Sequence, residues 1–297
     1  MMTRVLLPWP GLTVPPGLEV TIYDGTAAPP GDLGDIELYV LPYDSGRAPI
    51  ELIGSMPSLR AVQSLSAGVD NVRPLVPAGV QLANGRGLHD LSVAEHALAL
   101  ILAAQRDLPR WFRQQDRRTW ERAHTASLAD SRVLLVGHGS IGKAIERYLL
   151  AGEAEVVRVA RTAREGVHGI DELPALLPTA DIVVLIVPGG EGTRGLLGAD
   201  ELAALPDGAL VVNVGRGTAI DTDALVAEVG KGRLRAALDV VDPEPLPPEH
   251  PLWTERGVLI TPHIAGGSAS FSPRAKRLVE TQLARFAAGD PLLNVVT

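Results

Sequence analysis

The sequence has no cysteine among its 297 residues, which excludes disulfides, thiolate metal sites and a cysteine nucleophile. Aromatic residues are also scarce, at 4%, whereas 46% of the residues are hydrophobic, so Val, Leu, Ile and Ala must fill the cores. Such cores are typical of parallel sheets covered by helices. No apolar run is long enough to span a bilayer, and the first one ends at Pro8, too early for a signal peptide. We therefore expect a cytoplasmic protein.

An excess of positive charge is absent as well, because the formal net charge is -8. This balance argues against nucleic acid or an anionic membrane as the main partner, since both favour a basic surface. The chain is too long for one ordinary hydrophobic core. We therefore expect a globular protein with two domains.

Short apolar runs separated by clusters of Gly and Pro predict strands in the first part of the chain. These strands are predicted at residues 4–7, 20–23, 36–41 and 59–65. Asp90 or Ser92 is placed to cap a long helix whose apolar pattern ends before Pro109. The first region is therefore predicted to be a small α/β unit that leads into this helix.

From Arg132 onward, strands and helical segments alternate more regularly. Strands are predicted at 132–136, 156–160, 181–187, 209–214, 236–240 and 258–260. Helices are predicted at 143–149, after the first of these strands, and at 272–288, near the end of the sequence. Strands that alternate with helices predict doubly wound parallel sheets, so the fold class is α/β.

A glycine-rich turn follows the apolar run at 133–136. In a dinucleotide-binding turn the first glycine permits the tight bend, the second lets the backbone approach the pyrophosphate, and the third allows close packing of helix on strand. The helix that follows would offer unpaired N–H groups to the phosphates. The alternatives are a turn without a ligand, or the related turn of a methyltransferase. We expect cofactor contacts from Gly137, His138, Gly139, Ser140, Ile141 and Gly142.

The end of the next strand indicates which dinucleotide binds. An NAD site usually has Asp or Glu about 20 residues past the glycines, where it accepts from the ribose 2′-hydroxyl. This chain has Arg161, Thr162 and Arg164 there instead. A guanidinium binds a 2′-phosphate well and can stack on adenine, so these residues predict a pocket for NADP, with NAD as the second choice. A solvated basic loop is the alternative.

Three stretches far apart in the sequence each follow an apolar run, so each is predicted to lie at the end of a buried strand: 213–217, 239–245 and 261–266. Together they supply the guanidinium of Arg216, carboxylates and the imidazole of His263. Reduction of a 2-keto acid needs a fixed cation for the carboxylate and a proton donor beside the carbonyl. A carboxylate partner would raise the pKa of His263, so that its imidazolium delivers a proton near neutral pH.

Gly215 and Gly217 flank Arg216, and we expect them to free its backbone so that the side chain can point into a cleft. The planar fork of the arginine can hold both a carboxylate and a neighbouring carbonyl oxygen. A structural arginine in a turn is the alternative.

These motifs resemble those of the D-isomer-specific 2-hydroxyacid dehydrogenases, a family that includes glyoxylate/hydroxypyruvate reductases and phosphoglycerate dehydrogenases. The resemblance covers residues 66–267, with several motifs in the order of the family. It implies that Arg216 is the catalytic arginine, Glu244 the catalytic carboxylate and His263 the catalytic acid/base. The spacing in the family selects Glu244 over the nearby Asp242, which we interpret as a solvated loop charge.

The resemblance implies further contacts. Asp239 falls on the carboxamide-binding aspartate of the family. Ala67 and Gly68 fall on the loop whose backbone N–H groups face the substrate. Arg216 and His263 would also contact the substrate. The other cofactor contacts that we expect are Val187, Pro188, Thr193, Val214, Gly215, Arg216, His263, Ala265 and Gly266.

The remaining histidines do not form a ligand set, so we expect no metal. His96 is interpreted as a packed core or interface residue, and His138 as a residue whose backbone matters more than its ring.

By this resemblance, residues 91–267 form a Rossmann dinucleotide-binding domain, inserted into a flavodoxin-like catalytic domain built from residues 1–90 and 268–297. The reaction it implies transfers hydride between a nicotinamide cofactor, NADPH being favoured, and a small 2-keto or 2-hydroxy acid such as glyoxylate or hydroxypyruvate. The helix at 93–104 is apolar around much of its circumference, and the corresponding helix joins the dimer contact in this family. We therefore expect a homodimer.

Three other functions fit the same architecture: a formate dehydrogenase, a phosphite dehydrogenase and a nucleotide-sensing corepressor that binds without turnover. Formate enzymes usually carry Gln where this chain has Glu244, which counts against that branch. A phosphite enzyme keeps a similar triad. The run Val240-Val241-Asp242 and the residue His138 depart from the usual pattern of the family and weaken any inference about the particular substrate.

Overall fold

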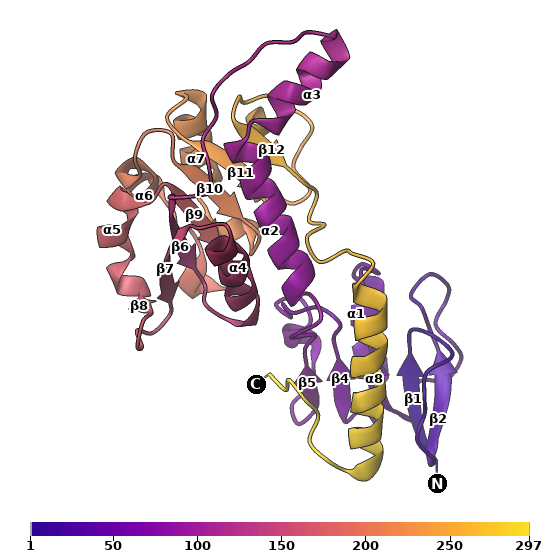
Figure 1. The fold of residues 1–297 in the computed structure, drawn as a ribbon. Coiled ribbons are helices and arrows are strands. Elements are labelled where there is room, and N and C mark those ends of the chain that lie inside the picture. The colour runs from indigo at the N-terminus through magenta and orange to yellow at the C-terminus, as the bar shows by residue number, and fades with distance from the viewer. Residues whose placement is uncertain (1, 297) are drawn as a thin grey trace. The chain divides into compact units, whose positions relative to one another are not determined.

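The computed structural model describes residues 2–296, which form two compact units. One unit, the split unit, joins the chain up to His89 with the chain from Ala269 onward, and the other, the continuous unit, runs from Asp90 to Ser268. Each unit contains one sheet, and every strand pairing within both sheets is parallel (Figure 1). The prediction of an α/β fold with two parallel-sheet domains is confirmed.

The split unit is built on a five-stranded sheet in the order β2-β1-β3-β4-β5, a flavodoxin-like winding. Alternate residues of the first strand serve opposite faces of this sheet. Leu6 packs with Ile50, whereas Val5 packs with Val279 near the end of the chain. The elements of this unit are β1 (Thr3–Leu7), β2 (Leu18–Ile22), β3 (Ile36–Val40), α1 (Ala48–Glu51), β4 (Ala61–Gln63), β5 (Gln81–Ala83) and α8 (Phe271–Ala288).

The continuous unit is built on a seven-stranded sheet in the order β12-β11-β10-β9-β6-β7-β8. The strand order reverses beside β6, the strand that leads into the glycine turn, and ligands of such sheets bind at this point, beyond the carboxyl ends of the strands. The elements are α2 (Asp90–Gln105), α3 (Leu108–Arg117), β6 (Arg132–Val136), α4 (Ser140–Ala151), β7 (Glu155–Ala160), β8 (His168–Gly169), α5 (Leu173–Leu176), β9 (Ile182–Leu185), α6 (Ala199–Ala204), β10 (Leu210–Asn213), α7 (Thr222–Gly230), β11 (Arg235–Leu238) and β12 (Val258–Ile260).

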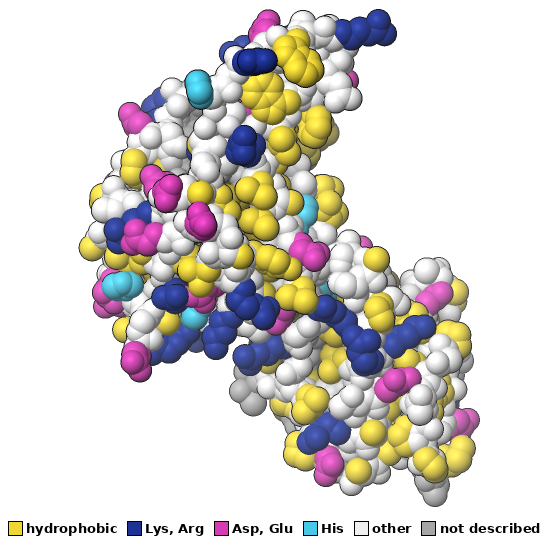
Figure 2. Space-filling model, in the orientation of Figure 1, with side chains coloured by type: hydrophobic (Ala, Val, Ile, Leu, Met, Phe, Trp, Pro, Cys, Tyr) yellow, Lys and Arg dark blue, Asp and Glu magenta, His cyan; other side chains and the backbone are white. Residues whose placement is uncertain are grey.

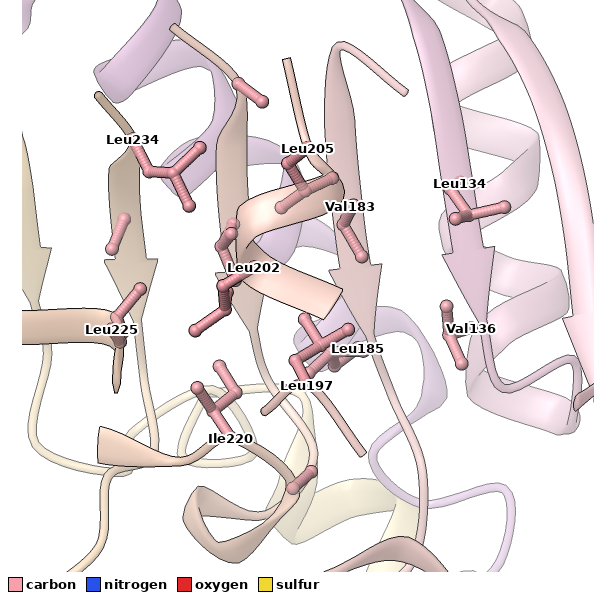
Figure 3. Packing of buried hydrophobic residues seen from close by; sticks show 14 of the residues in the cluster. Leu134, Val136, Val183, Leu185, Leu197, Leu202, Leu205, Ile220, Leu225 and Leu234 are labelled. Atoms are coloured by element: carbon pink, nitrogen blue, oxygen red, sulfur yellow. The ribbon is translucent and has the colours of Figure 1, made fainter. Parts of the chain in front are cut away.

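Two hydrophobic clusters cover the two faces of this sheet. Val133 of β6 packs with Ala97 of α2 on one face, whereas Leu134 packs on the other with residues of α6 and α7. Figure 3 shows the second cluster, in which side chains of β6 and β9 face Leu202 and Leu205. Because successive strand residues serve opposite layers, these strands are apolar at every position, as the sequence indicated.

Helices α2 and α3 carry apolar side chains that the continuous unit leaves exposed. Leu102 is 38% exposed, Leu108 37% and Phe112 60%, and Trp120 in the following loop is 90% exposed. Figure 2 shows hydrophobic side chains gathered over these two helices on the visible face. Among the described residues, no helix is both long and apolar enough to cross a membrane.

Some elements of the structure differ from the expectations. The strand expected at 59–65 is paired only over β4, Ala61–Gln63, and the neighbouring strand β5 was not predicted. The helix α3 was not predicted either, because it begins beside Pro109, at the position expected to end the preceding helix.

Candidate active site

Three neighbouring strands of the continuous unit bring the predicted catalytic residues together. Arg216 follows β10, Glu244 lies in the loop after β11, and His263 follows β12. Because these strands are parallel and adjacent, their carboxyl ends share one edge of the sheet. Residues that are distant in sequence therefore meet at that edge.

His263 and Glu244 form a direct hydrogen bond, with Nδ1 of the histidine 2.6 Å from Oε1 of the glutamate. This bond raises the pKa of His263 above its ordinary value; burial and the nearby Arg216 cation act in the opposite direction but do not cancel it. The imidazolium is therefore stabilised, and its Nδ1 is occupied by the hydrogen bond to Glu244. The opposite nitrogen, Nε2, is the one that can deliver a proton to a substrate.

The backbone around Arg216 is held close to its neighbours. The side-chain amide of Asn213 donates to the carbonyl of Arg216 at 2.8 Å, and the N–H of Gly215 donates to the Asn213 side-chain oxygen at 3.0 Å. A Cβ on Gly217 would lie 1.8 Å from the carbonyl oxygen of Val241. The glycines are thus required by close packing of backbone on backbone. Conformational freedom, the reason expected from the sequence, does not apply, because neither glycine has a positive φ.

Asp239, expected to contact the carboxamide, is a buried carboxylate that holds the loop of His263. It accepts hydrogen bonds from the hydroxyl of Thr261 at 2.6 Å and from the N–H groups of Ile264 and Ala265, each at 3.0 Å. Burial acts to raise the pKa of Asp239, but these hydrogen bonds and that of His96 outweigh it, so the pKa is lowered. An ionised Asp239 therefore holds the side chain of Thr261 before His263 and the backbone of Ile264 and Ala265 after it.

His96 has a role that sequence reasoning missed. Its Nε2 lies 2.9 Å from the hydroxyl of Thr261 and 3.3 Å from Oδ1 of Asp239. This contact joins α2 to the loop after β12. The only signal in the sequence was the helix face that His96 shares with Val93 and Leu100, which predicts packing but no polar partner.

Two glycines of the glycine turn have steric reasons that match their predicted tasks. Gly137 has φ +108, and a Cβ there would lie 2.2 Å from the carbonyl oxygen of Ile186, while a Cβ on Gly142 would lie 2.0 Å from the carbonyl oxygen of Gly137. Gly139 differs, because nothing lies within 4 Å of the position that a Cβ on this glycine would occupy. This opening is exposed and adjoins the first turn of α4, where a phosphate could approach the backbone.

The predicted determinants of cofactor choice follow β7. Arg161, Thr162 and Arg164 are all exposed, and Nη2 of Arg164 donates to the carbonyl oxygen of His138 in the glycine turn at 3.1 Å. The basic loop therefore lies beside the turn within the same unit. Their contact with a nucleotide remains a prediction.

The other predicted cofactor residues surround the same edge of the sheet. The hydroxyl of Thr193 donates to the carbonyl of Pro188 at 2.7 Å, which closes the loop after β9. Side chains of Val187, Val214 and Ala265 are buried, so any contact with a cofactor would use their backbone atoms. The hydroxyl of Ser140 donates to Oδ1 of Asp90 at 3.3 Å. Ile141 and Gly266 are half-buried.

Ala67 and Gly68, the predicted substrate loop, belong to the split unit, in the segment after β4. The carbonyl of Ala67 accepts from the side-chain amide of Asn84 at 2.9 Å, which holds this segment against the residues after β5. Both residues are half-buried. No group of three or more His, Asp or Glu side chains in the described part of the chain could hold a metal ion.

The model of the family described as D-isomer specific 2-hydroxyacid dehydrogenase, NAD binding domain, matches residues 98–265. The chain therefore belongs to this family. A glyoxylate reductase from Aeropyrum pernix is 31% identical over 285 residues, which cover 87% of this chain and 82% of that protein. The crystal structure of an NADPH-dependent glyoxylate/hydroxypyruvate reductase from Sinorhizobium meliloti, in complex with NADP and sulfate, is 29% identical with a TM-score of 0.85, over 99% of this chain and 98% of that one.

A D-3-phosphoglycerate dehydrogenase from Archaeoglobus fulgidus is 31% identical over 258 residues, covering 83% of this chain but only 49% of that protein. The chain thus spans about half the length of the phosphoglycerate dehydrogenases that it matches.

Proposed function

We propose that the chain is a D-2-hydroxyacid dehydrogenase that reduces a small 2-keto acid, such as glyoxylate or hydroxypyruvate, with NADPH as the favoured cofactor. The observation that carries this proposal is the hydrogen bond between His263 and Glu244 at 2.6 Å, formed beside Arg216 at the carboxyl edge of the glycine-turn sheet. The family provides the reaction class, and the similarity to a glyoxylate reductase over most of both chains supports a short substrate.

The residues of the continuous unit fit a dinucleotide with a 2′-phosphate. Open space beside Gly139 admits the pyrophosphate at the start of α4, and the exposed guanidinium groups of Arg161 and Arg164 follow β7. No carboxylate stands among residues 160–164 to repel a phosphate. The Sinorhizobium meliloti reductase, which is NADPH-dependent and was crystallised with NADP, supports the same choice. When bound, the cofactor would supply the hydride.

The side chains of the chain itself would handle the substrate and its proton. Arg216 would bind the carboxylate and the neighbouring carbonyl oxygen through its planar fork, which also polarises the carbonyl. His263 would donate the proton on Nε2 to the carbonyl oxygen as it becomes an alkoxide. Glu244 would hold the imidazolium in place and, by raising its pKa, keep it protonated to higher pH than a free histidine. Asp239 would keep the loop of His263 in position through the N–H groups that it accepts.

The experiment that tests this proposal is an activity panel of glyoxylate, hydroxypyruvate and larger 2-keto acids, each with NADPH and NADH. Phosphite and formate are assayed in the same panel with NADP and NAD. We expect turnover of at least one small 2-keto acid, faster with NADPH. Activity on phosphite or formate alone, or tight nucleotide binding without any turnover, would overturn the assignment and favour one of the related functions.

A further inference from the structure

A chain of polar side chains connects α4, the glycine turn and the segment after β7. The guanidinium of Arg158 donates to Oε1 of Glu146, and Nε2 of His138 lies 2.8 Å from Oε2 of the same carboxylate. On the other side of the ring, Nη2 of Arg164 lies 3.1 Å from Nδ1 of His138. The carboxylate thus holds one partner with each oxygen, and the histidine ring bridges two charged groups.

The partners of His138 define where its proton lies. A guanidinium can only donate, so Nδ1 of His138 must accept from Arg164. The proton of the neutral ring is therefore on Nε2, which donates it to Glu146. The side chain of His138 is 9% exposed and that of Glu146 13% exposed, so water competes little for these bonds.

The carboxylate of Glu146 is ionised in this arrangement. Burial acts to raise its pKa, but the hydrogen bonds from His138 and Arg158 outweigh burial and lower the pKa. Because Glu146 is on α4 and Arg158 is on β7, the carboxylate is anchored to the framework of the sheet. It can therefore hold the ring of His138 in one orientation and one tautomer.

Arg164, in contrast, is an exposed side chain on a short turn. Its backbone is paired in both directions with Val167, at 3.0 and 2.9 Å. Its Nη2 contacts both the ring and the carbonyl oxygen of His138, each at 3.1 Å, and this places the guanidinium against the glycine turn. The other nitrogens of the fork, Nε and Nη1, have no partner among the described residues and could bind an anion. An exposed arginine that is held in this way loses less side-chain entropy when it binds a phosphate.

We propose that Glu146 is a positioning residue for cofactor choice. Through His138, Glu146 holds Arg164 in the orientation that receives the 2′-phosphate of the nucleotide, while Glu146 itself does not contact that phosphate. The inference rests on the proposed NADPH preference and assigns part of that preference to a residue outside the nucleotide pocket. His138, in this arrangement, contributes through its ring, in addition to the backbone contribution expected from the sequence.

The substitution Glu146→Gln separates positioning from simple electrostatics, because the two predict opposite signs. Removal of a negative charge near the basic loop would strengthen the binding of a phosphate by Coulomb attraction. A glutamine, however, cannot accept from both His138 and Arg158, since one of its side-chain positions is a donor. If the amide NH₂ faces His138, the ring must take its proton on Nδ1, where it can no longer accept from Arg164. Positioning therefore predicts weaker phosphate binding.

The test measures binding of adenosine 2′,5′-bisphosphate and of 5′-AMP to the full chain by calorimetry, because the two probes differ only in the 2′-phosphate. For Glu146→Gln we expect the bisphosphate affinity to fall about tenfold, the effect of one charge-assisted hydrogen bond. The affinity for 5′-AMP should change less than about twofold. Glu155→Gln is the matched control: it removes the same charge at the opposite end of β7, where the carboxylate contacts Arg132 at 3.6 Å, and it should leave both affinities unchanged.

A double variant shows whether the effect acts through Arg164. In an Arg164→Ala background, Glu146→Gln should cause no further loss of bisphosphate affinity, because the group that it positions is gone. A second route avoids any folding defect of Glu146→Gln. His138→Asn keeps an acceptor oxygen near the position of Nδ1 and should retain more of the 2′-phosphate preference than His138→Leu, which has none.

Each other outcome has a definite meaning. Unchanged or stronger bisphosphate binding in Glu146→Gln would overturn the positioning role, while the NADPH preference of the wild-type protein would stand. Equal losses for both probes would show that Glu146 only supports the fold of the turn. If the wild-type protein binds the bisphosphate no better than 5′-AMP, the proposed cofactor choice itself fails.

Discussion

Glu244 accepts a hydrogen bond from Nδ1 of His263 at 2.6 Å, and this bond is the largest cause of the raised pKa of the histidine. A raised pKa means that the imidazolium persists to higher pH than in a free histidine. In the proposed reduction the protonated ring is the active form, so the rate should fall as pH rises through this pKa.

The first prediction therefore concerns the pH profile of kcat/KM for 2-keto acid reduction, which reports groups of the free enzyme. In Glu244→Gln the main cause of the raised pKa is removed, so the fall on the alkaline side should move to lower pH. Asp242→Asn is the control, because Asp242 is a loop carboxylate 3.8 Å from Arg194 and should leave the midpoint in place. An identical alkaline midpoint in Glu244→Gln and wild type would contradict this role of Glu244.

The second prediction concerns the two cationic groups of the site. His263→Ala or Arg216→Ala should lower kcat/KM by roughly a hundredfold or more, because each removes a charge interaction made with the reacting group. Both side chains lie beyond the ends of their strands, outside the hydrophobic clusters, so the thermal midpoint should change little. Steady-state kinetics check the loss of kcat/KM, and circular dichroism melts check the thermal midpoint. Near-wild-type catalysis in either variant would refute the assignment.

The third prediction is the cofactor preference. Two charge-assisted contacts to a 2′-phosphate would favour NADPH over NADH by roughly a hundredfold, reduced by solvent screening because Arg161 and Arg164 are exposed. Arg161→Ala should raise KM for NADPH much more than KM for NADH. Arg256→Ala, an equal loss of charge just before the start of β12, is the control. Equal efficiency of the wild-type protein with both cofactors would show that the basic residues form only a solvated loop.

The fourth prediction separates two glycines of the same turn. Gly142→Ala places a Cβ 2.0 Å from a backbone oxygen and should destabilise the fold by roughly 1–3 kcal/mol, as overpacking does. Gly139→Ala meets open space, so its free energy of unfolding should stay close to that of the wild type, while its nucleotide affinity falls. Denaturant unfolding and nucleotide titration distinguish the two; a stable Gly142→Ala protein would refute the steric argument.

The fifth prediction is association into a homodimer through α2 and α3. Their exposed apolar side chains, among them Phe112 at 60%, are more than a monomer usually leaves in contact with water. Light scattering at micromolar concentration should give twice the mass of the chain, and Phe112→Asp should shift it toward the monomer. Leu150→Asp on α4, where Leu150 is 48% exposed, is the control. A monomeric wild-type protein would exclude this association.

The sequence predicted the elements whose apolar runs are buried on both faces. The strand expected at 209–214 contains β10, Leu210–Asn213, whose four residues are all buried, and the glycine-turn strand expected at 132–136 is β6. The position of the triad was also predictable, because the carboxyl ends of adjacent parallel strands must meet at one edge. None of this requires side-chain detail.

The helix α3 and the strand β5 were missed for physical reasons. Leu108, Trp111 and Phe112 have helical spacing, but none of the ten residues of α3 is buried, and Pro109 indicated the end of a helix. The proline is tolerated because it lies in the first turn, where no intrahelical N–H bond is lost. The strand β5 has three residues, of which only Leu82 and Ala83 are buried. Such a run is too short to predict a strand from its composition.

The polar contacts of the site depended on tertiary packing. His96 reaches Asp239 only because α2 packs over β11 and β12, and Glu146, on the helix α4 that begins just after the turn, contacts the ring of His138. Neither pairing has a fixed spacing in sequence. Both followed from the structure alone.

The division of the split unit across the chain has a consequence for synthesis on the ribosome. The residues of β1 and β3 pack against Ala275, Val279 and Leu283 of α8, and the buried side chain of Gln282 donates to Gln63, the last residue of β4. The five-stranded sheet therefore keeps one apolar face uncovered until α8 has been translated, whereas the continuous unit is complete as soon as its own residues emerge. Since transiently exposed apolar surface promotes aggregation, the nascent chain needs protection longest at this sheet.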